Sequence, residues 1–187
     1  MLVLLFANIV RTVQSVRDME IQKKRIEKEN YDHLTGLPMR SRGEAMIADL
    51  IMEQDGCLVF CDMDNLKKIN DIYGHKAGDR ALGCLGTLLK DVGEPSVACR
   101  LGGDEFLVFV KGIENKEILD RRMDQLFSRL NDSCGDFLFC SAGICFVSGE
   151  GFDYQKALKC ADTALYESKK KGKRRYSYYE KMEDMKV

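Results

Sequence analysis

The 187-residue sequence lacks the signals of a zinc protein and of a disulfide-stapled scaffold. Its eight cysteines include no Cys-x-x-Cys pair, and only His33 and His75 could add ligands, so the usual zinc spacings are missing. Nearly all the cysteines fall inside apolar strand or helix patterns, which favours reduced, buried thiols in a cytosolic compartment. Neither histidine has a base or nucleophile as a partner, and we interpret both as structural.

The sequence also lacks an excess of charge of one sign. The net charge is −1, so no global field draws the chain to nucleic acid or to a membrane surface. A basic tract at residues 169–175 closes an amphipathic helix, where cations are favoured, and has no interleaved aromatic residues. We therefore expect no nucleic-acid partner. The length allows one ordinary domain with a sizeable core, plus an appendage.

No apolar run is long enough to cross a bilayer, which takes about 20 helical residues. Residues 1–10 are strongly apolar, without the flanking basic region and cleavage site of a signal peptide. They are either the cytosolic end of a transmembrane helix whose remainder precedes residue 1, or the start of an amphipathic helix in a soluble protein. The first is favoured because residues 1–6 are apolar on every side. We expect a cytoplasmic protein, at the inner face of the cell membrane if the first interpretation holds.

Residues 1–30 contain no Gly or Pro and are interpreted as one helix. Apolar positions spaced by three and four predict a coiled-coil-like seam that fades towards residue 30. A lone surface helix packed on its own domain is the alternative. We expect this helix to precede a second domain at residues 31–187. The nine seam positions, six of them apolar, are Leu2, Leu5, Ile9, Thr12, Val16, Met19, Lys23, Ile26 and Asn30.

Beyond the first helix, helical and strand patterns alternate. The pattern predicts an α+β fold in which helices pack on a sheet that contains an antiparallel hairpin. The expected helices are 41–54, 75–92, 116–131 and 154–171, the expected strands are 57–62, 137–147 and 175–179, and the hairpin spans 96–111.

The most informative motif is Arg-Leu-Gly-Gly-Asp-Glu-Phe at residues 100–106. Apolar residues on both sides predict a β-hairpin with Asp104 and Glu105 at its tip. Gly102 and Gly103 let a backbone approach a phosphate closely, and adjacent carboxylates are hard-oxygen ligands for Mg²⁺. On its own, such a turn is more often a solvated acidic turn.

A second acidic motif follows the apolar run at residues 58–61, where Asp62 and Asp64 occupy alternate positions. Their carboxylates are expected to leave the same face of one strand end. Two neighbouring strands that end in carboxylates could hold a metal–triphosphate complex, which needs oxygen ligands and lysines. An acidic loop that caps a helix is the alternative, but capping needs one acid rather than four.

These motifs, together with two further stretches, resemble the GGDEF domain, the catalytic domain of diguanylate cyclases. The two stretches are residues 32–40, Asp-His-Leu-Thr-Gly-Leu-Pro-Met-Arg, and residues 161–173, which end in Lys-Lys-Lys-Gly-Lys. The four blocks occur in family order over about residues 31–178. The resemblance implies a palm-like, ferredoxin-related central antiparallel sheet flanked by helices and preceded by a long N-terminal helix. It also implies that Asp32 pairs with Arg100.

The resemblance implies a site for GTP and two Mg²⁺ or Mn²⁺ ions. Metal ligands would be Asp62, the Met63 carbonyl, Asp104 and Glu105. Asp104 and Glu105 would be catalytic, with Glu105 as ligand or as base for the attacking hydroxyl. A functional role for Asp64 stays open against a role in ordering the following turn. Substrate-binding positions would be Asn65, Leu66 and Lys67 at the phosphates, Asn70 and Asp79 at guanine, the backbone of Gly102 and Gly103, and Lys169 and Lys173 at the phosphates.

The sequence departs from the family pattern at several of these positions. Leu66 replaces Phe, Met39 replaces Asn, Lys173 replaces Arg and Arg174 replaces Asn. Lysine keeps the charge at position 173 but loses the bidentate fork, which weakens triphosphate binding. An Arg-x-x-Asp product-inhibition motif before the hairpin is missing: Gly93 and Ser96 stand at its two positions, so we expect no product-inhibition site.

The resulting hypothesis is a diguanylate cyclase that condenses two GTP into cyclic di-GMP and two pyrophosphates across a homodimer. Each domain would supply half of the active site, and the N-terminal helix would position the two domains. One alternative is a catalytically weak GTP-binding regulatory module, and another is a cyclase that makes a mixed dinucleotide. Asp79 opposes the latter, because a carboxylate accepts from guanine groups that adenine lacks. A sensor region or membrane tether before residue 1 is a further expected partner.

Overall fold

The structure, a computed structural model, describes residues 6, 11–20, 22, 30–92, 96–113, 115–134, 138–148 and 152–180. Its backbone contacts divide the chain into two units, Met1–Tyr31 and Asp32–Val187. In the first unit residues 11–20 are helical, and so are 6 and 22. The long N-terminal helix is therefore not evident as a whole, and the predictions for the rest of residues 1–29 lie outside the described residues. No helix in the described ranges is both long and apolar enough to cross a membrane.

A five-stranded sheet organises the second unit, in the order β2-β3-β1-β4-β5. The central strand β1 (Gly56–Asp64) pairs antiparallel with β3 (Glu105–Lys111) on one side and with β4 (Phe139–Val147) on the other. Strand β2 (Ser96–Gly102) forms the predicted hairpin with β3. Almost all of β1 is buried, as expected for an apolar strand with a neighbour on each side.

The last strand, β5 (Tyr176–Tyr178), adds a parallel edge to the predicted central antiparallel sheet. It pairs parallel with β4, so the sheet is mixed. The reason is the connection: helix α6 (Tyr154–Lys170) links the two strands, and a helical crossover returns the chain in the same direction.

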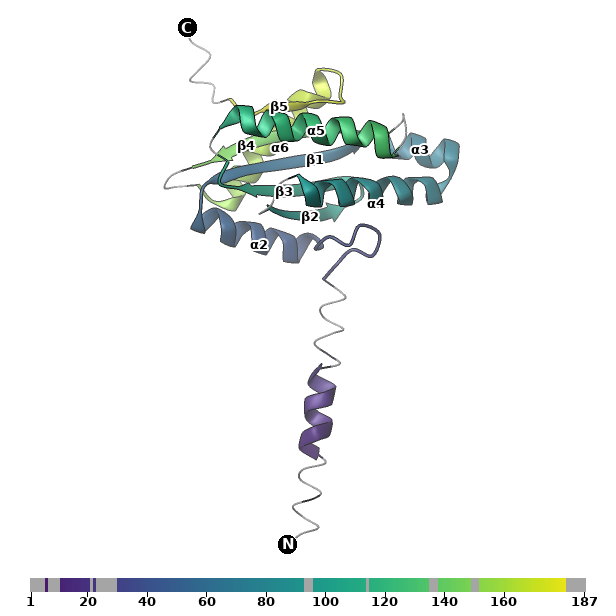
Figure 1. Cartoon of the computed structure of the whole chain (residues 1–187), viewed down its shortest axis with the longest axis vertical. Coiled ribbons are helices and arrows are strands. Elements are labelled where there is room, and N and C mark those ends of the chain that lie inside the picture. Colours follow the sequence, from purple (N-terminus) through teal and green to yellow (C-terminus); the bar gives the residue numbers. More distant parts are fainter. Residues whose placement is uncertain are drawn as a thin grey trace. The chain divides into compact units, whose positions relative to one another are not determined.

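Helices cover both faces of the sheet (Figure 1). Alternate residues of β1 point to opposite faces. Cys57, Val59 and Cys61 belong to the hydrophobic cluster formed with α4 (His75–Asp91) and α5 (Lys116–Cys134). Leu58 and Phe60 belong to the cluster formed with α2 (Arg40–Glu53) and α6. The sheet is therefore the middle layer of three.

Close backbone packing fixes α6 on the sheet. At Gly143 of β4, a Cβ atom would collide with the backbone of Ala161 and Leu165. Only glycine permits this approach. Since the end of α6 carries Lys169, this contact also sets where that lysine can reach.

One helix was not predicted. Helix α3 (Leu66–Tyr73) follows β1 almost directly and precedes α4. Its apolar residues Leu66, Ile69 and Ile72 do recur at a helical spacing, but the helix has only eight residues, which is too short a segment to identify from spacing alone. The elements expected beyond residue 31 are present, with ends that differ by at most three residues.

Buried thiols were predicted, and six cysteines are free and buried. Burial raises the pKa of the Cys61 thiol to about 12, with a smaller contribution from the Asp62 carboxylate. Cys84 on α4 is disulfide-bonded, so the expectation of reduced thiols throughout is wrong at that position.

Candidate functional site

Strand pairing brings the two acidic motifs together. Asp62 at the end of β1 lies opposite Glu105 at the start of β3. One residue further, the backbone N–H of Met63 donates a hydrogen bond of 2.9 Å to the carbonyl of Asp104. Directly paired residues of an antiparallel sheet place their side chains on the same face. The end of β1 and the tip of the hairpin thus lie next to each other, as the sequence predicted.

The hairpin tip leaves open space above its glycines. Gly102 and Gly103 have φ values of +140° and +56°, and a Cβ atom at either position would meet nothing within 4 Å. Residues other than glycine rarely adopt this backbone conformation, because their Cβ atom clashes with the backbone. The absence of a neighbouring atom means that a ligand group could approach the backbone here.

Asp62 is held by a lysine. Its carboxylate lies 2.8 Å from the Lys169 ammonium and its side chain is 14 % exposed. Burial raises the pKa of Asp62 above its ordinary 3.8; Lys169 opposes this rise, and the Asp104 and Asp64 carboxylates add to it. One lysine therefore offsets only part of the repulsion among three carboxylates.

Asp64 has a different environment from Asp62. It is 1 % exposed, and both of its oxygens accept the Ser141 hydroxyl, at 3.0 and 2.9 Å. The backbone N–H of Arg174 donates to one of them at 3.0 Å. Asp64 therefore contacts the turn that follows α6. The sequence had suggested a different turn, the one directly after Asp64.

The N-terminus of α3 offers free amide groups next to these acids. Asn65 precedes the helix in the left-handed conformation, with φ of 61°, and makes no side-chain cap. The first N–H groups of a helix, here those of Leu66 and Lys67, have no acceptor within the helix, and the helix dipole favours an anion there. The Lys173 ammonium lies 3.5 Å from the Asn65 side-chain oxygen. The start of α3 and Lys173 thus lie near each other, and their binding of phosphate stays a prediction.

The two predicted guanine-reading residues lie on α3 and α4. A Cβ atom on Gly78 would collide with the side-chain oxygen of Asn70. Asn70 thus lies directly against the residue that precedes Asp79. Asp79 is exposed in the first turns of α4.

Arg40 is a site residue that the sequence did not single out. Its guanidinium lies 3.8 Å from the Glu105 carboxylate, and its Nε donates to the Leu101 carbonyl at 3.0 Å. Arg40 belongs to the opening motif, but its contact depends on how α2 packs beside the hairpin. No local pattern of residues could have revealed it.

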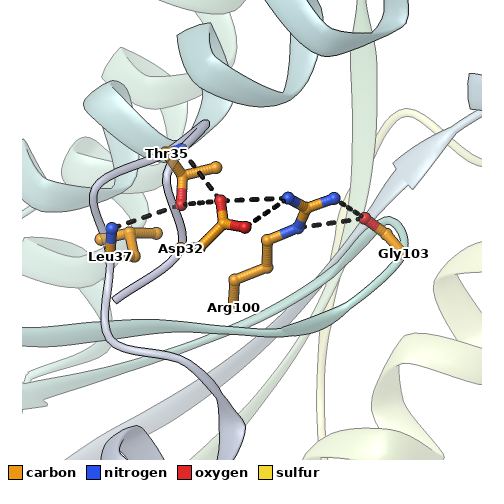
Figure 2. A network of polar contacts seen from close by, with 5 residues as sticks. All are labelled: Asp32, Thr35, Leu37, Arg100 and Gly103. Atoms are coloured by element: carbon orange, nitrogen blue, oxygen red, sulfur yellow. Dashed lines mark hydrogen bonds and ion pairs between the residues drawn. The ribbon is translucent and has the colours of Figure 1, made fainter. Parts of the chain in front are cut away.

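The hairpin is also tied to the loop at residues 32–37, as Figure 2 shows. Arg100 forms two bonds of 3.0 Å to the Asp32 carboxylate and donates to the Gly103 carbonyl at 2.6 and 3.2 Å. The Thr35 hydroxyl and amide also donate to Asp32, at 2.7 and 2.9 Å. The expected pairing of Asp32 with Arg100 is confirmed, and it fixes the backbone of the glycine tip.

The acidic residues could bind a divalent cation, but they do not form a complete coordination site by themselves. Within the described ranges, no three His, Cys, Asp or Glu side chains converge closely enough to hold a metal ion by themselves. Asp62 and Asp104 are nevertheless neighbours whose mutual repulsion a cation would relieve. Carboxylate oxygens are the ligands that Mg²⁺ and Mn²⁺ prefer, and Mg²⁺ commonly takes one or two carboxylates plus substrate phosphates. The residues fit a cation that arrives with a phosphate ligand.

Comparison with known proteins gives a consistent family. Residues 29–175 match the family described as diguanylate cyclase, GGDEF domain. The chain is 37 % identical over 150 residues to the diguanylate cyclase DgcP of Escherichia coli. This alignment covers 74 % of this chain and 44 % of DgcP. It is 31 % identical over 159 residues to the cyclic di-GMP phosphodiesterase PdeR of the same organism, covering 80 % of this chain and 24 % of PdeR. The chain thus spans only part of these relatives.

Solved structures share the fold. The coiled coil and GGDEF domain of DgcB from Caulobacter crescentus, in complex with c-di-GMP, superposes with a TM-score of 0.82 at 22 % identity, over 93 % of this chain and 98 % of that one. A microbial GGDEF domain studied for its interaction with cyclic di-GMP gives a TM-score of 0.70 at 33 % identity, over 81 % and 97 %.

The Asp32–Arg100 pair predicts a change in acid stability. Burial alone would raise the pKa of Asp32, but the Thr35 hydrogen bonds and the Arg100 guanidinium hold it below 3.8. Asp32 therefore stabilises the fold above pH 3.8, and this contribution is lost as the pH falls through its folded pKa. We expect Asp32→Asn to cost about 1–3 kcal/mol at pH 7. The cost should shrink below about pH 4. Urea unfolding between pH 3 and 7 measures it.

Asp91→Asn is the matched control for this measurement. Asp91 also pairs with an arginine, Arg129, at 3.0 Å, but both side chains are half exposed. An exposed pair contributes about 0–1 kcal/mol. A loss for Asp32→Asn that is equally small, or that grows as the pH falls, would contradict the assignment.

Proposed function

The chain belongs to the GGDEF, or diguanylate cyclase, domain family, and on that premise we propose that it condenses two GTP into cyclic di-GMP and two pyrophosphates. The observation that carries the proposal is the juxtaposition of Asp62 with the hairpin tip, where Met63 bonds to Asp104. Relatives named as cyclases and as phosphodiesterases both match. Family membership alone therefore does not assign the activity, and the proposal rests on the acidic site.

We assign the phosphate end of GTP to the space between the hairpin tip and the start of α3. The first amide groups of α3 would bind phosphate oxygens, and Lys67, Lys169 and Lys173 would offset their remaining charge. The backbone of Gly102 and Gly103 would lie against the phosphates, because in the described part of the chain a Cβ atom at either position meets nothing within 4 Å. On nucleotide binding, Lys169 would exchange its bond with Asp62 for one with a phosphate.

Asp62, Asp104 and the Met63 carbonyl would hold the divalent cations, with Glu105 as a further ligand. Bound there with GTP, Mg²⁺ or Mn²⁺ would neutralise phosphate charge and polarise the α-phosphate. In the reaction the 3′-oxygen of one GTP forms a bond to the α-phosphorus of the other, and the bond to the bridging oxygen of pyrophosphate breaks. Glu105 is the candidate acceptor for the hydroxyl proton. Arg40, at 3.8 Å, would help to keep that carboxylate in place.

Guanine is the base that the α3–α4 residues fit. The Asp79 carboxylate would accept from N1–H and the exocyclic amine, and Asn70 would add a further hydrogen bond. The GTP-binding regulatory module remains the second candidate function. It is favoured by Lys173, which provides a single ammonium where a guanidinium would provide a fork.

Two copies of the domain are needed, because each domain would supply one GTP and half of the catalytic groups. Residues 11–20 offer one means of pairing. Val16 and Met19, two of the predicted seam positions, lie on this helix with 46 % and 61 % of their surface exposed. Apolar side chains at these spacings favour association with a second helix. We propose that such pairing sets how often two catalytic domains meet.

Removing the hairpin carboxylate tests the proposed function. Purified chain with Mg²⁺ and GTP should release pyrophosphate and form cyclic di-GMP, at a rate that rises more than linearly with protein concentration while dimers are scarce. We expect Asp104→Ala to lower turnover at least about a hundredfold, as expected when a metal ligand at a phosphoryl-transfer site is removed. Product chromatography alongside a pyrophosphate assay measures this.

Asp91→Ala is the control, since Asp91 is an exposed acid on α4 that pairs with Arg129. It should keep wild-type turnover. Near-normal activity of Asp104→Ala would show that the metal assignment is wrong. GTP binding without pyrophosphate release by the wild type would favour the regulatory module instead.

Product should not inhibit through a site before the hairpin, because Gly93 and Ser96 replace the arginine and aspartate that would capture it. Residues 93–95 lie outside the described ranges. Initial rates of the wild-type chain are expected to stay unchanged at micromolar cyclic di-GMP. Inhibition of an intact dimer by micromolar cyclic di-GMP would contradict the expectation. The Ser96→Asp variant is a control, which tests whether one added carboxylate is enough to create product inhibition.

A further inference from the structure

The turn after α6 has an unusual backbone. Gly172, Lys173 and Arg174 all have positive φ, with values of +105°, +63° and +54°. Glycine adopts such values freely, whereas two consecutive residues with side chains do so only at a cost in free energy. Something in the surrounding structure must therefore stabilise residues 173 and 174 in this conformation.

The Lys173 N–H donates to the Ser168 carbonyl at 3.1 Å, and a second stabilising contact comes from the buried Asp64 carboxylate. It accepts the backbone N–H of Arg174 at 3.0 Å, across 110 residues of sequence. Asp64 and Ser141 are 1 % and 0 % exposed, so water does not compete for this acceptor. Hydrogen bonds to an ionised carboxylate are roughly twice as strong as those between neutral groups. The Arg174 guanidinium also lies over the Phe139 ring, 3.5 Å from its centre.

The same turn carries a predicted phosphate-binding residue. Lys173 directly precedes Arg174, and its ammonium lies 3.5 Å from the Asn65 side-chain oxygen at the start of α3. Lys169, one helical turn earlier, reaches Asp62. The backbone at residues 173 and 174 therefore decides where the Lys173 ammonium lies relative to the phosphate end of the site.

We propose that Asp64 is a positioning residue, which holds the strained turn after α6 so that Lys173 reaches the phosphates of the nucleotide. The inference rests on the proposed function for the identity of that ligand. Asp64 does not serve as a metal ligand in this account, because the Ser141 hydroxyl and the Arg174 amide already occupy its oxygens. The two aspartates of β1 thus have different roles. Asp62 would contact the ligand, whereas Asp64 binds other groups of the protein.

Asp64→Asn and Ser141→Ala form a matched pair of variants. Asparagine keeps the volume but turns one acceptor oxygen into a donor that faces other donors. Ser141→Ala removes a hydrogen bond from the same carboxylate and leaves the Arg174 contact intact. Both variants should lower the melting temperature, whereas only Asp64→Asn should release the turn.

Hydrogen exchange tests the anchor without reference to function. In Asp64→Asn, peptides covering residues 170–176 should exchange faster than in wild type, while in Ser141→Ala they should exchange as in wild type. Equal exchange in Asp64→Asn and wild type would overturn the proposal, even if the protein bound no nucleotide. Failure of the wild type to bind GTP would instead remove the proposed function.

Nucleotide affinity tests the consequence. The probe is 3′-deoxy-GTP with Mg²⁺, which lacks the attacking hydroxyl, and calorimetry gives its Kd. We expect Asp64→Asn to raise the Kd about tenfold, and Ser141→Ala to change it by less than about threefold. Adding Asp64→Asn to Lys173→Met should have little further effect, because Asp64 acts through Lys173. Full additivity of the two changes, or equal affinity of the matched pair, would overturn the proposal.

Discussion

The antiparallel pairing of β1 with β3 on one side and β4 on the other is the constraint on which the rest of the structure depends. The pairing with β3 brings the end of β1 to the tip of the glycine hairpin, so that Asp62 lies opposite Glu105. The pairing with β4 places Ser141 within reach of Asp64. A shift of one residue in either register would turn these side chains to the other face of the sheet. The chemistry of the site is therefore fixed by the same hydrogen bonds that fix the fold.

This arrangement concentrates negative charge that the protein compensates only in part. Burial and neighbouring carboxylates raise the pKa of Asp62, and Lys169 acts against them. The Arg100 guanidinium is fully engaged, since it binds Asp32 and the carbonyl of Gly103. Arg100 thus anchors the hairpin but is not available to a ligand, and Asp104 and Glu105 add further negative charge at the hairpin tip. A divalent cation with a phosphate ligand would complete this balance of charge.

The sequence predicted the parts of the site that depend on local pattern. Apolar runs and paired glycines located β1 and the hairpin, and the aspartates at alternate positions 62 and 64 indicated a shared face. It did not predict α3, because an apolar spacing that extends over only eight residues, with Ile69 as the buried residue, is too short to identify a helix. Nor could it show that Asp64 binds Arg174 or that Arg40 approaches Glu105, because those contacts join residues 110 and 65 positions apart only after the helices pack. The parallel direction of β5 likewise follows from the α6 crossover rather than from any residue in β5.

The most direct test of the central claim is the binding of Mn²⁺, followed by electron paramagnetic resonance, with and without 3′-deoxy-GTP. If the ends of β1 and the hairpin form one site, the wild-type chain should bind Mn²⁺ more tightly when the nucleotide is present. Asp62→Asn and Asp104→Asn should each remove that enhancement, although the two residues are 42 positions apart in the sequence. Wild-type enhancement in either variant would contradict the account.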